Sequence, residues 1–254
     1  MIYLYRCSGG NIQRKDIKMD IWYLYHSGFA VKTENHFLIF DYWRDTPKGG
    51  NICDGVINTK ELWEEDVIVF ASHRHSDHYN RVIERWQREI PRCRLILSDD
   101  IKKNDDAIMV SPNKDYRQPD FSFKTFLSND EGVAFLLNID DKIIFHAGDL
   151  NWWHWDGEPD NWNDEMRDSY QSQIDMLKGL SIDLAFIPVD PRLEAEYYYG
   201  IDYLMRTADV KKVVPMHFGD KHGVVQRLLK DSISEEYRDR ILPLMRRGQK
   251  AEIL

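Results

Sequence analysis

Residues 73–78 read His-Arg-His-Ser-Asp-His, and this run constrains the chain more than any other segment. It follows an apolar stretch at 67–70 that is typical of a buried strand, and it precedes 79–90, where apolar residues recur at helical spacing. In an extended chain His73 and His75 would point to the same side. Imidazole and carboxylate groups clustered at a strand end are typical of a divalent-metal site, whereas a solvated surface turn would not need such a cluster. The run therefore predicts a metal site rather than a histidine-rich surface turn.

Other segments extend this pattern along the chain. A Gly-Asp pair ends the segment 142–149, which begins like a strand, and a late histidine follows the strand-like start of the segment 213–219. Earlier in the chain, the segments 25–31 and 37–41 look like a hairpin of strands. Together with the HxHxDH run, and in this order, they resemble the motifs of the metallo-β-lactamase superfamily. The resemblance extends from Asp20 to the C-terminus and is strongest to the branch of ascorbate-phosphate lactonase-like hydrolases.

The resemblance implies an α/β fold, a four-layer αβ/βα sandwich of the metallo-β-lactamase type, around a metal centre. The metal ligands that it implies are His73, His75, Asp77, His78, Asp149 and His217. The first two would bind one ion, Asp149 would bridge, and the other three would bind a second ion. Asp77 would also have a catalytic role, either orienting the attacking hydroxide or accepting a proton. One or two divalent ions are expected, with zinc favoured and manganese or iron as alternatives.

The chain departs from the family pattern at the third histidine of the first ion. The equivalent stretch, 125–132, contains no histidine. Asp130 is the preferred substitute, ahead of Asn129 and Ser128. His146 is a rival ligand, although its other interpretation is a buried, hydrogen-bonded histidine. A weak or vacant first site is the remaining alternative.

A tryptophan-rich segment, 151–162, directly follows the Gly-Asp motif and must begin beside the site. Trp153, His154 and Trp155 are therefore candidate substrate-binding residues, with packing against the core or a dimer contact as the alternative. Arg192 follows a later strand and is a candidate for binding a carboxylate or phosphate. A salt bridge of Arg192 to a neighbouring carboxylate is its simpler interpretation.

Composition narrows the class of partner. The 254 residues include 34 basic and 43 acidic side chains, a formal charge of −9, which argues against a nucleic-acid partner. Three widely spaced cysteines form no disulfide pattern, so we expect a cytoplasmic protein. No apolar run is long enough to span a membrane, and the N-terminus lacks a signal-peptide pattern. A small-molecule substrate is expected, and the sequence leaves a homo-oligomer open.

The domain organisation that we expect is a poorly anchored extension at 1–19, with an edge strand at 2–5 as the alternative, followed by a single domain at 20–254. The predicted strands are 21–25, 29–33, 37–41, 67–71, 94–98, 107–110, 121–127, 133–139, 142–146, 182–187 and 212–216. The predicted helices are 79–90, 167–179, 194–208, 222–230 and 234–244, with a short one after Thr59.

The leading functional hypothesis is a metal-dependent hydrolase that uses a metal-activated hydroxide on a small lactone, ester or phosphate-bearing substrate. A phosphodiesterase or nuclease of the same fold is the first alternative. The second alternative is a sensor that binds a metal or ligand without turnover, which the missing histidine keeps open.

Overall fold

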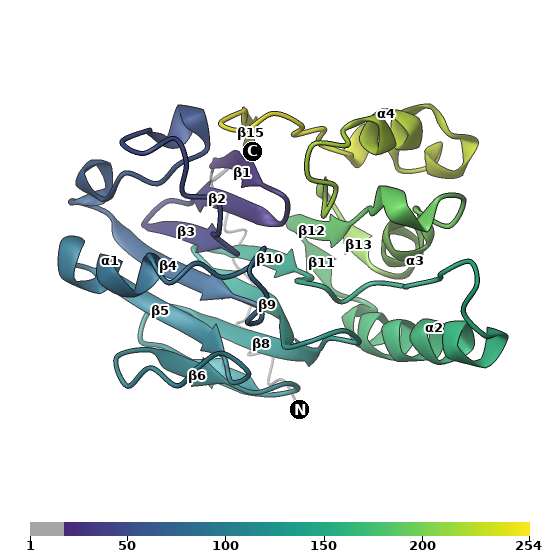
Figure 1. Ribbon diagram of the computed structural model, residues 1–254, viewed down its shortest axis with the longest axis horizontal. Helices are drawn as coiled ribbons and strands as arrows, with labels where there is room; N and C mark the ends of the chain where they lie inside the picture. The colour runs from purple at the N-terminus through teal and green to yellow at the C-terminus, as the bar shows by residue number, and fades with distance from the viewer. Residues whose placement is uncertain (1–17) are drawn as a thin grey trace, which may run out of the picture.

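Two β-sheets packed face to face form the centre of the molecule, which the computed structural model describes over residues 18–254 (Figure 1). The strands of the first sheet are, in spatial order, β15 (Lys250–Ile253), β1 (Met19–Tyr25), β2 (Gly28–Lys32), β3 (His36–Phe40), β4 (Asp66–Ala71), β5 (Cys93–Ser98) and β6 (Ile108–Val110). Those of the second are β14 (Val213–Met216), β12 (Leu184–Pro188), β10 (Lys142–His146), β9 (Val133–Ile139), β8 (Ser122–Leu127) and β7 (Asp115–Arg117). A short parallel pair joins β11 (Ser181–Ile182) to β13 (Asp209–Val210).

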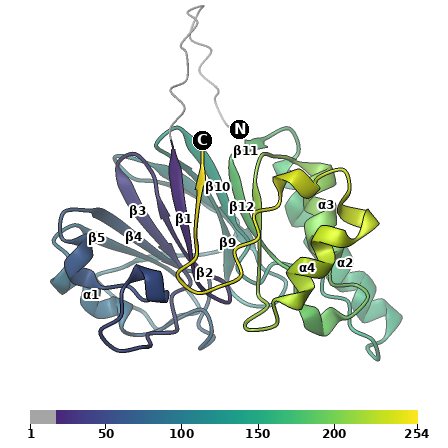
Figure 2. The same ribbon diagram turned by 90° about the horizontal axis from the view of Figure 1, so that it is seen from above.

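Helices cover the outer faces of both sheets. Helix α1 (Ile83–Glu89) lies outside the first sheet, and α2 (Asp160–Ile174), α3 (Tyr199–Thr207) and α4 (Gly223–Lys230) lie outside the second (Figure 2). This helix–sheet–sheet–helix order confirms the predicted four-layer αβ/βα sandwich.

Strand β4 shows how sequence and layers correspond. Ile68 and Phe70 point into the core between the two sheets, whereas Val67, Val69 and Ala71 join the second core, under α1. Alternate residues of a strand face opposite sides, so a strand that is covered on both sides needs a continuous apolar run. The apolar run before the HxHxDH motif is therefore the signature of a central strand.

The strand ends place the polar residues. In both sheets several neighbouring strands are parallel, β3 to β6 in the first and β10, β12 and β14 in the second, so their carboxyl ends share one edge. Polar residues follow these ends closely: Asp41 after β3, His73 after β4, Asp149 after β10, Asp190 after β12 and His217 after β14. This edge is where a ligand site is expected in an α/β protein.

The predicted helices need correction at their ends. Helix 79–90 begins only at Ile83, because the Asn80 side chain accepts the N–H of Val82 at 2.9 Å and holds a turn there. Helix 167–179 spans 160–174 instead, since it starts directly after Pro159.

Two later predicted helices also need correction. The segment 194–208 is helical only over 199–207: Glu194 has a positive φ of 50°, and turns follow it up to residue 198. The predicted helix 234–244 is wrong: the chain forms 3₁₀ turns at 232–234 and 238–240, and then Leu242 donates its N–H to Val213 of β14 (2.8 Å). The short helix after Thr59 is a 3₁₀ turn at 59–62.

The predicted strands all appear, each shifted by at most two residues, although 182–187 is divided between β11 and β12; β7, β13 and β15 were not predicted. These three strands are short and lie at the edges of their sheets, where a strand needs little apolar patterning. The extension predicted at 1–19 lies outside the described residues except for its last two, and Met19 already belongs to β1.

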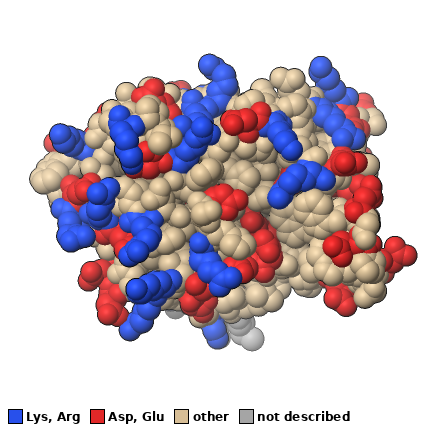
Figure 3. Space-filling view, viewed as in Figure 1, with Lys and Arg blue, Asp and Glu red and all other residues tan. Residues whose placement is uncertain are grey.

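Over residues 18–254, no helix combines the length and the apolar character that crossing a bilayer requires. On the face shown in Figure 3, basic and acidic side chains are interspersed, without a continuous basic track of the kind that binds nucleic acid.

Candidate metal centre

The loop after β4 is shaped by the buried carboxylate of Asp41. It accepts hydrogen bonds from the backbone N–H of Ser72 (2.8 Å) and from the Ser72 hydroxyl (2.7 Å), and its Oδ2 lies 2.8 Å from Nδ1 of His78. Burial alone would raise the pKa of Asp41, but the neighbouring His78 lowers it below its usual value. Because the carboxylate accepts, Nδ1 of His78 donates and Nε2 faces the site.

A second buried carboxylate orients His217 in the same way. Nδ1 of His217 lies 2.9 Å from Oδ2 of Asp190, and Nε of Arg192 donates to the same oxygen at 2.9 Å. Burial alone would lower the pKa of His217, but the carboxylates of Asp149 and Asp190 raise it to about 10. The surroundings of this imidazole therefore strongly favour a positive charge, which either a proton or a metal ion can supply.

Asp149 stands between two sets of histidines. Its Oδ1 lies 3.2 Å from Nε2 of His78 and 3.3 Å from Nε2 of His217, whereas its Oδ2 lies 3.5 Å from Nε2 of His73. The preceding residue, Gly148, has a φ of 55°, and a Cβ there would lie 2.7 Å from a side chain of the β4 loop. Glycine therefore lets the Asp149 carboxylate reach both sets of histidines.

The structure brings together all six ligands that the resemblance implies, and it adds one residue. Their ligand atoms form two groups, each with its members within 4.8 Å of one another: His73, His75 and Asp149 in the first, and His26, Asp77, His78 and His217 in the second. The Nε2 atoms of His26, His73 and His78 and Oδ1 of Asp149 are buried without a hydrogen-bond partner. Buried acceptors that face one another are costly unless a cation lies between them, so the residues present fit a pair of divalent ions.

Two carboxylates lie near the place of the missing third histidine. Asp130 lines a cavity at this edge, and burial followed by the charge of Asp149 raises its pKa. The next residue, Glu131, has Oε2 3.4 Å from Nε2 of His75, and Oε2 is buried without a hydrogen-bond partner. Sequence reasoning named Asp130 and passed over Glu131, although both belong to the same turn.

Gly132 holds this turn against the β4 loop. It has a φ of 68°, and a Cβ at this position would lie 2.0 Å from the backbone oxygen of Ser72 and 2.6 Å from Cβ of His73. The next residue, Val133, donates its N–H to the same Ser72 oxygen at 2.9 Å. No other residue type fits here without moving the two sheets apart.

His146, the rival ligand, is fully buried and hydrogen-bonded at both nitrogens. Nε2 lies 2.9 Å from the carbonyl oxygen of Ser27, and Nδ1 accepts the N–H of Gly148 at 3.1 Å. Its ring stacks on Phe40 with centroids 4.9 Å apart. With no free lone pair it cannot bind an ion, so its interpretation as a buried, satisfied histidine holds and the ligand hypothesis is wrong.

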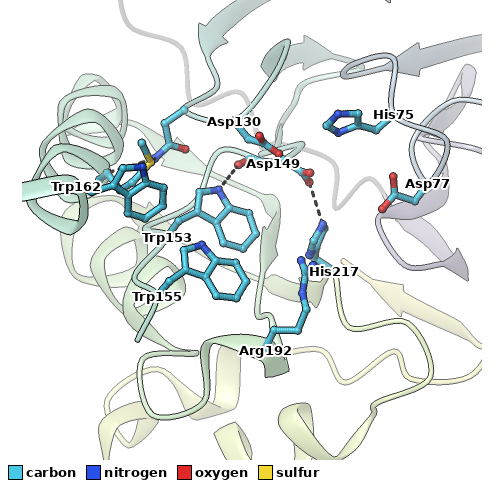
Figure 4. A pocket seen from close by; sticks show the side chains of 11 residues that line it. His75, Asp77, Asp130, Asp149, Trp153, Trp155, Trp162, Arg192 and His217 are labelled. Carbon is cyan, nitrogen blue, oxygen red and sulfur yellow. Dashed lines mark hydrogen bonds and ion pairs between the residues drawn. The ribbon is translucent and has the colours of Figure 1, made fainter. Parts of the chain in front are cut away.

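A cavity of about 310 Å³ opens over the two groups (Figure 4). Its lining residues are His75, Asp77, Asn129, Asp130, Asp149, Trp153, Trp155, Trp162, Met166, Arg192 and His217. The tryptophans line one side of Asp149 and His217, and His75 and Asp77 lie on the other side (Figure 4). The cavity thus combines an aromatic wall with the exposed part of the candidate metal centre.

The predicted substrate-binding residues differ in their placement. Trp153 is buried and donates its indole N–H to the backbone oxygen of Asp149 (3.0 Å), while its ring stacks on Trp155 with centroids 6.0 Å apart. Arg192 forms a salt bridge to Asp190, as its simpler interpretation predicted. It also lines the cavity, with Cζ 5.4 Å from the Trp155 ring. His154 does not line the cavity, and its ring contacts Tyr199.

No protein-family model matches the sequence, and neither does any curated protein with which it was compared. Solved structures do match. The chain aligns over 93% of its length with 99% of Igni18, a metallo hydrolase from Ignicoccus hospitalis (15% identity, TM-score 0.61), and over 93% with 99% of the metallo-β-lactamase fold protein YhfI from Bacillus subtilis (11%, 0.56). The chain has the metallo-β-lactamase fold. The chain also resembles 46% of CmlA, a diiron β-hydroxylase from Streptomyces venezuelae, over 82% of its own length (10% identity, TM-score 0.50).

Membership of the ascorbate-phosphate lactonase-like branch stays a prediction, since these similarities show the metallo-β-lactamase fold alone. Sequence reasoning missed the orienting roles of Asp41 and Asp190. Each follows a buried strand by one or two residues, which is the same signal that identified the HxHxDH run. Sequence reasoning did not place His26 among the ligands, because its approach to the site depends on the turn between β1 and β2.

Proposed function

We propose that the protein is a metal-dependent hydrolase that uses hydroxide, formed from water at the metal centre, to attack a small lactone, ester or phosphate-bearing substrate. The observation that carries this proposal is the position of Asp149. One of its oxygens faces His78 and His217 and the other faces His73, as expected for a carboxylate shared between two ions.

Two divalent ions, when bound, would acidify water and stabilise negative charge on the substrate. The protein's own groups prepare this chemistry. Asp41 and Asp190 hold His78 and His217 with Nε2 toward the ions. Asp77, whose side chain is 45% exposed and lines the cavity, is placed to orient the attacking water or to accept its proton.

The cavity supports a small-molecule substrate. A volume of about 310 Å³ lies in the range of small-ligand pockets and leaves little room for a polymer. Trp155 and Trp162 offer flat apolar surfaces, and Arg192 supplies a cation at the rim. Nε and one terminal nitrogen of Arg192 are engaged with Asp190, so its remaining N–H groups can bind an anionic group of the substrate.

The identity of the metal depends on the third ligand of the first ion. We propose that a carboxylate, Asp130 or Glu131, replaces the histidine there. Carboxylate in place of imidazole favours harder ions, so manganese or iron competes with zinc at this site. CmlA, one of the similar structures, is named as a diiron enzyme, and iron is therefore included in the test.

We further propose that the enzyme acts in the cytoplasm. Cys53 and Cys93 are free thiols in the structure, as suits a reducing compartment. The net charge of −9 supports a small-molecule partner rather than a nucleic acid.

The test begins with the metal content of the purified protein, measured by inductively coupled plasma mass spectrometry. Metal-free protein is then reloaded with zinc, manganese or iron and assayed against panels of lactones, esters, phosphodiesters and single-stranded RNA. We expect hydrolysis of a small substrate that a chelator abolishes and the metal restores, with far-UV circular dichroism unchanged, because a large core folds without metal.

The outcomes separate the alternatives. Turnover of RNA or phosphodiesters alone would replace the proposal with a nuclease or phosphodiesterase. Tight metal binding without hydrolysis of any panel member would favour the sensor. For the first ion, Asp130→Ala and Glu131→Ala are compared, and the variant that weakens one of two metal affinities identifies the carboxylate.

A further inference from the structure

His26 lies in the second group of ligands, although the HxHxDH pattern assigns it no role. We propose that His26 is a direct protein ligand of the second divalent cation. This inference rests on the proposed metal centre and deepens it, because it adds a protein donor to one of the two ions.

The backbone of His26 is fixed in an unusual conformation. It occupies the two-residue turn between β1 and β2 with a φ of 58°, a conformation that glycine or asparagine adopts more readily. Its N–H donates to the hydroxyl of Tyr23 at 2.8 Å, and its carbonyl accepts the N–H of His217 at 3.2 Å. Strained residues that the surroundings hold in place from both sides are concentrated at functional sites.

The side chain of His26 has no partner other than the site. Its Nε2 is buried without a hydrogen bond and lies 3.6 Å from Oδ2 of Asp77. Its ring centroid lies 4.1 Å from that of His217 and 5.8 Å from that of His78. Two donors about 2.1 Å from one ion can be up to about 4.2 Å apart. The 3.6 Å between His26 and Asp77 is within this limit, and the ligand atoms of the whole second group lie within 4.8 Å of one another, so their spacing suits one shared cation.

Both groups reach the cavity. The first does so through His75, whose side chain is 42% exposed, and the second through Asp77, whose side chain is 45% exposed. His26 and His78 do not line the cavity, so they would hold the second ion from its protein side.

The test compares His26→Asn with His222→Asn as a matched control. Asparagine tolerates a positive φ, so the metal-free fold should survive. His222 lies five residues beyond His217 and belongs to neither group. Metal-free wild type and both variants are titrated with Zn²⁺ and with Mn²⁺ by calorimetry, and the bound metal is counted by mass spectrometry. Far-UV circular dichroism and thermal unfolding of the metal-free proteins monitor the fold.

We expect two binding events in the wild type and in His222→Asn. In His26→Asn one affinity should fall by about 100-fold or more, since even partners outside the coordination shell contribute about 10- to 100-fold. Two unchanged affinities in a folded His26→Asn protein would overturn the assignment. If that variant does not fold, His26→Gly, which removes the strain at φ 58°, replaces it. No substrate is present, so a metal-binding wild type that hydrolyses nothing would defeat the proposed function and leave this inference standing.

Discussion

Two clusters of histidine and carboxylate lie at opposite edges of the sheets, and they differ in whether the histidine nitrogens are satisfied. At the far edge, His36 has Nδ1 2.9 Å from Asp140 and Nε2 2.9 Å from Asp120, and Arg94 pairs with both Asp120 and Asp66. At the metal edge, the Nε2 atoms of three histidines have no hydrogen-bond partner. The residue types are alike, but only the second cluster has free lone pairs.

This difference distinguishes a structural cluster, here called the clasp (His36, Asp120, Asp140 and Arg94), from a candidate metal site. His36 begins β3 in the first sheet, whereas Asp140 follows β9 in the second, so their contact ties the two sheets together. Burial alone would lower the pKa of His36, but Asp120 and Asp140 raise it, which favours the charged imidazolium. An imidazolium has no lone pair for a metal, and the guanidinium of Arg94 already occupies the carboxylates. Proximity of histidine and aspartate is therefore a weaker sign of a metal than unsatisfied nitrogen atoms.

The largest expected effect comes from comparing a histidine-to-asparagine substitution at each of the two edges. His78→Asn should lower kcat by about a thousandfold, or about 4 kcal/mol of activation free energy, because it removes a metal ligand. His36→Asn should leave metal content and kcat near wild type but lower the free energy of unfolding by about 2–3 kcal/mol, because it removes the charge-assisted hydrogen bonds of the imidazole to Asp140 and Asp120. Steady-state kinetics, metal analysis and urea unfolding measure the three quantities. Loss of metal from the His36→Asn protein would contradict the purely structural role of the His36 cluster.

A smaller effect is expected at the cavity wall. Trp155→Ala should raise KM by about tenfold with little change in kcat, because the ring offers binding surface but does not touch the metal ligands. Trp63→Ala is the control, since Trp63 is 61% exposed and lies outside the cavity. Trp153 is unsuitable for this test, because it is buried and hydrogen-bonded to the Asp149 backbone. An unchanged KM in a folded Trp155→Ala protein would show that the aromatic wall does not bind substrate.

The smallest effect is the pH dependence of the clasp. His36 has a raised pKa in the folded protein, so its stabilising contribution is complete below the unfolded value of about 6.5 and is lost as the pH rises through the higher folded value. Asp140 has its pKa lowered to about 2, so its contribution is present above about 3.9 and is lost as the pH falls toward 2. Metal-free protein should therefore lose this contribution on both sides of a window from about pH 4 to 6.5, and the dependence should be weaker in His36→Asn. Equal urea-unfolding profiles in both proteins would contradict the ion pairing.

The sequence predicted those features that depend on local pattern. Apolar runs located nearly every strand, and the polar residues after those runs include His73, Asp149 and His217, which the structure brings together. Helix boundaries depended on caps and breaks: the Asn80 side chain, Pro159 and the positive φ of Glu194 decided where helices begin. The sequence pattern alone does not show whether such a local interaction ends a helix that the apolar periodicity predicts to continue.

The sequence pattern could not predict contacts between segments that are far apart in the chain. The position of His26 depends on a hydrogen bond to His217, which lies 191 residues further along the chain. The choice between Asp130 and Glu131 depends on how the turn bends at Gly132. His146 was a reasonable ligand candidate from its place beside Gly148 and Asp149, and only its two hydrogen bonds exclude it.

Gly132 has a consequence for engineering this molecule. The candidate ligands His73 and His75 follow a strand of one sheet and Asp149 follows a strand of the other, and the β8–β9 turn packs against the β4 loop at Gly132. A graft or a longer loop at this turn would act as a wedge, changing the span between the two halves of the centre without touching a ligand. The cavity wall on α2 carries no such restriction, so new substrate preferences are better sought by varying Trp162 and Met166 than by rebuilding the turn.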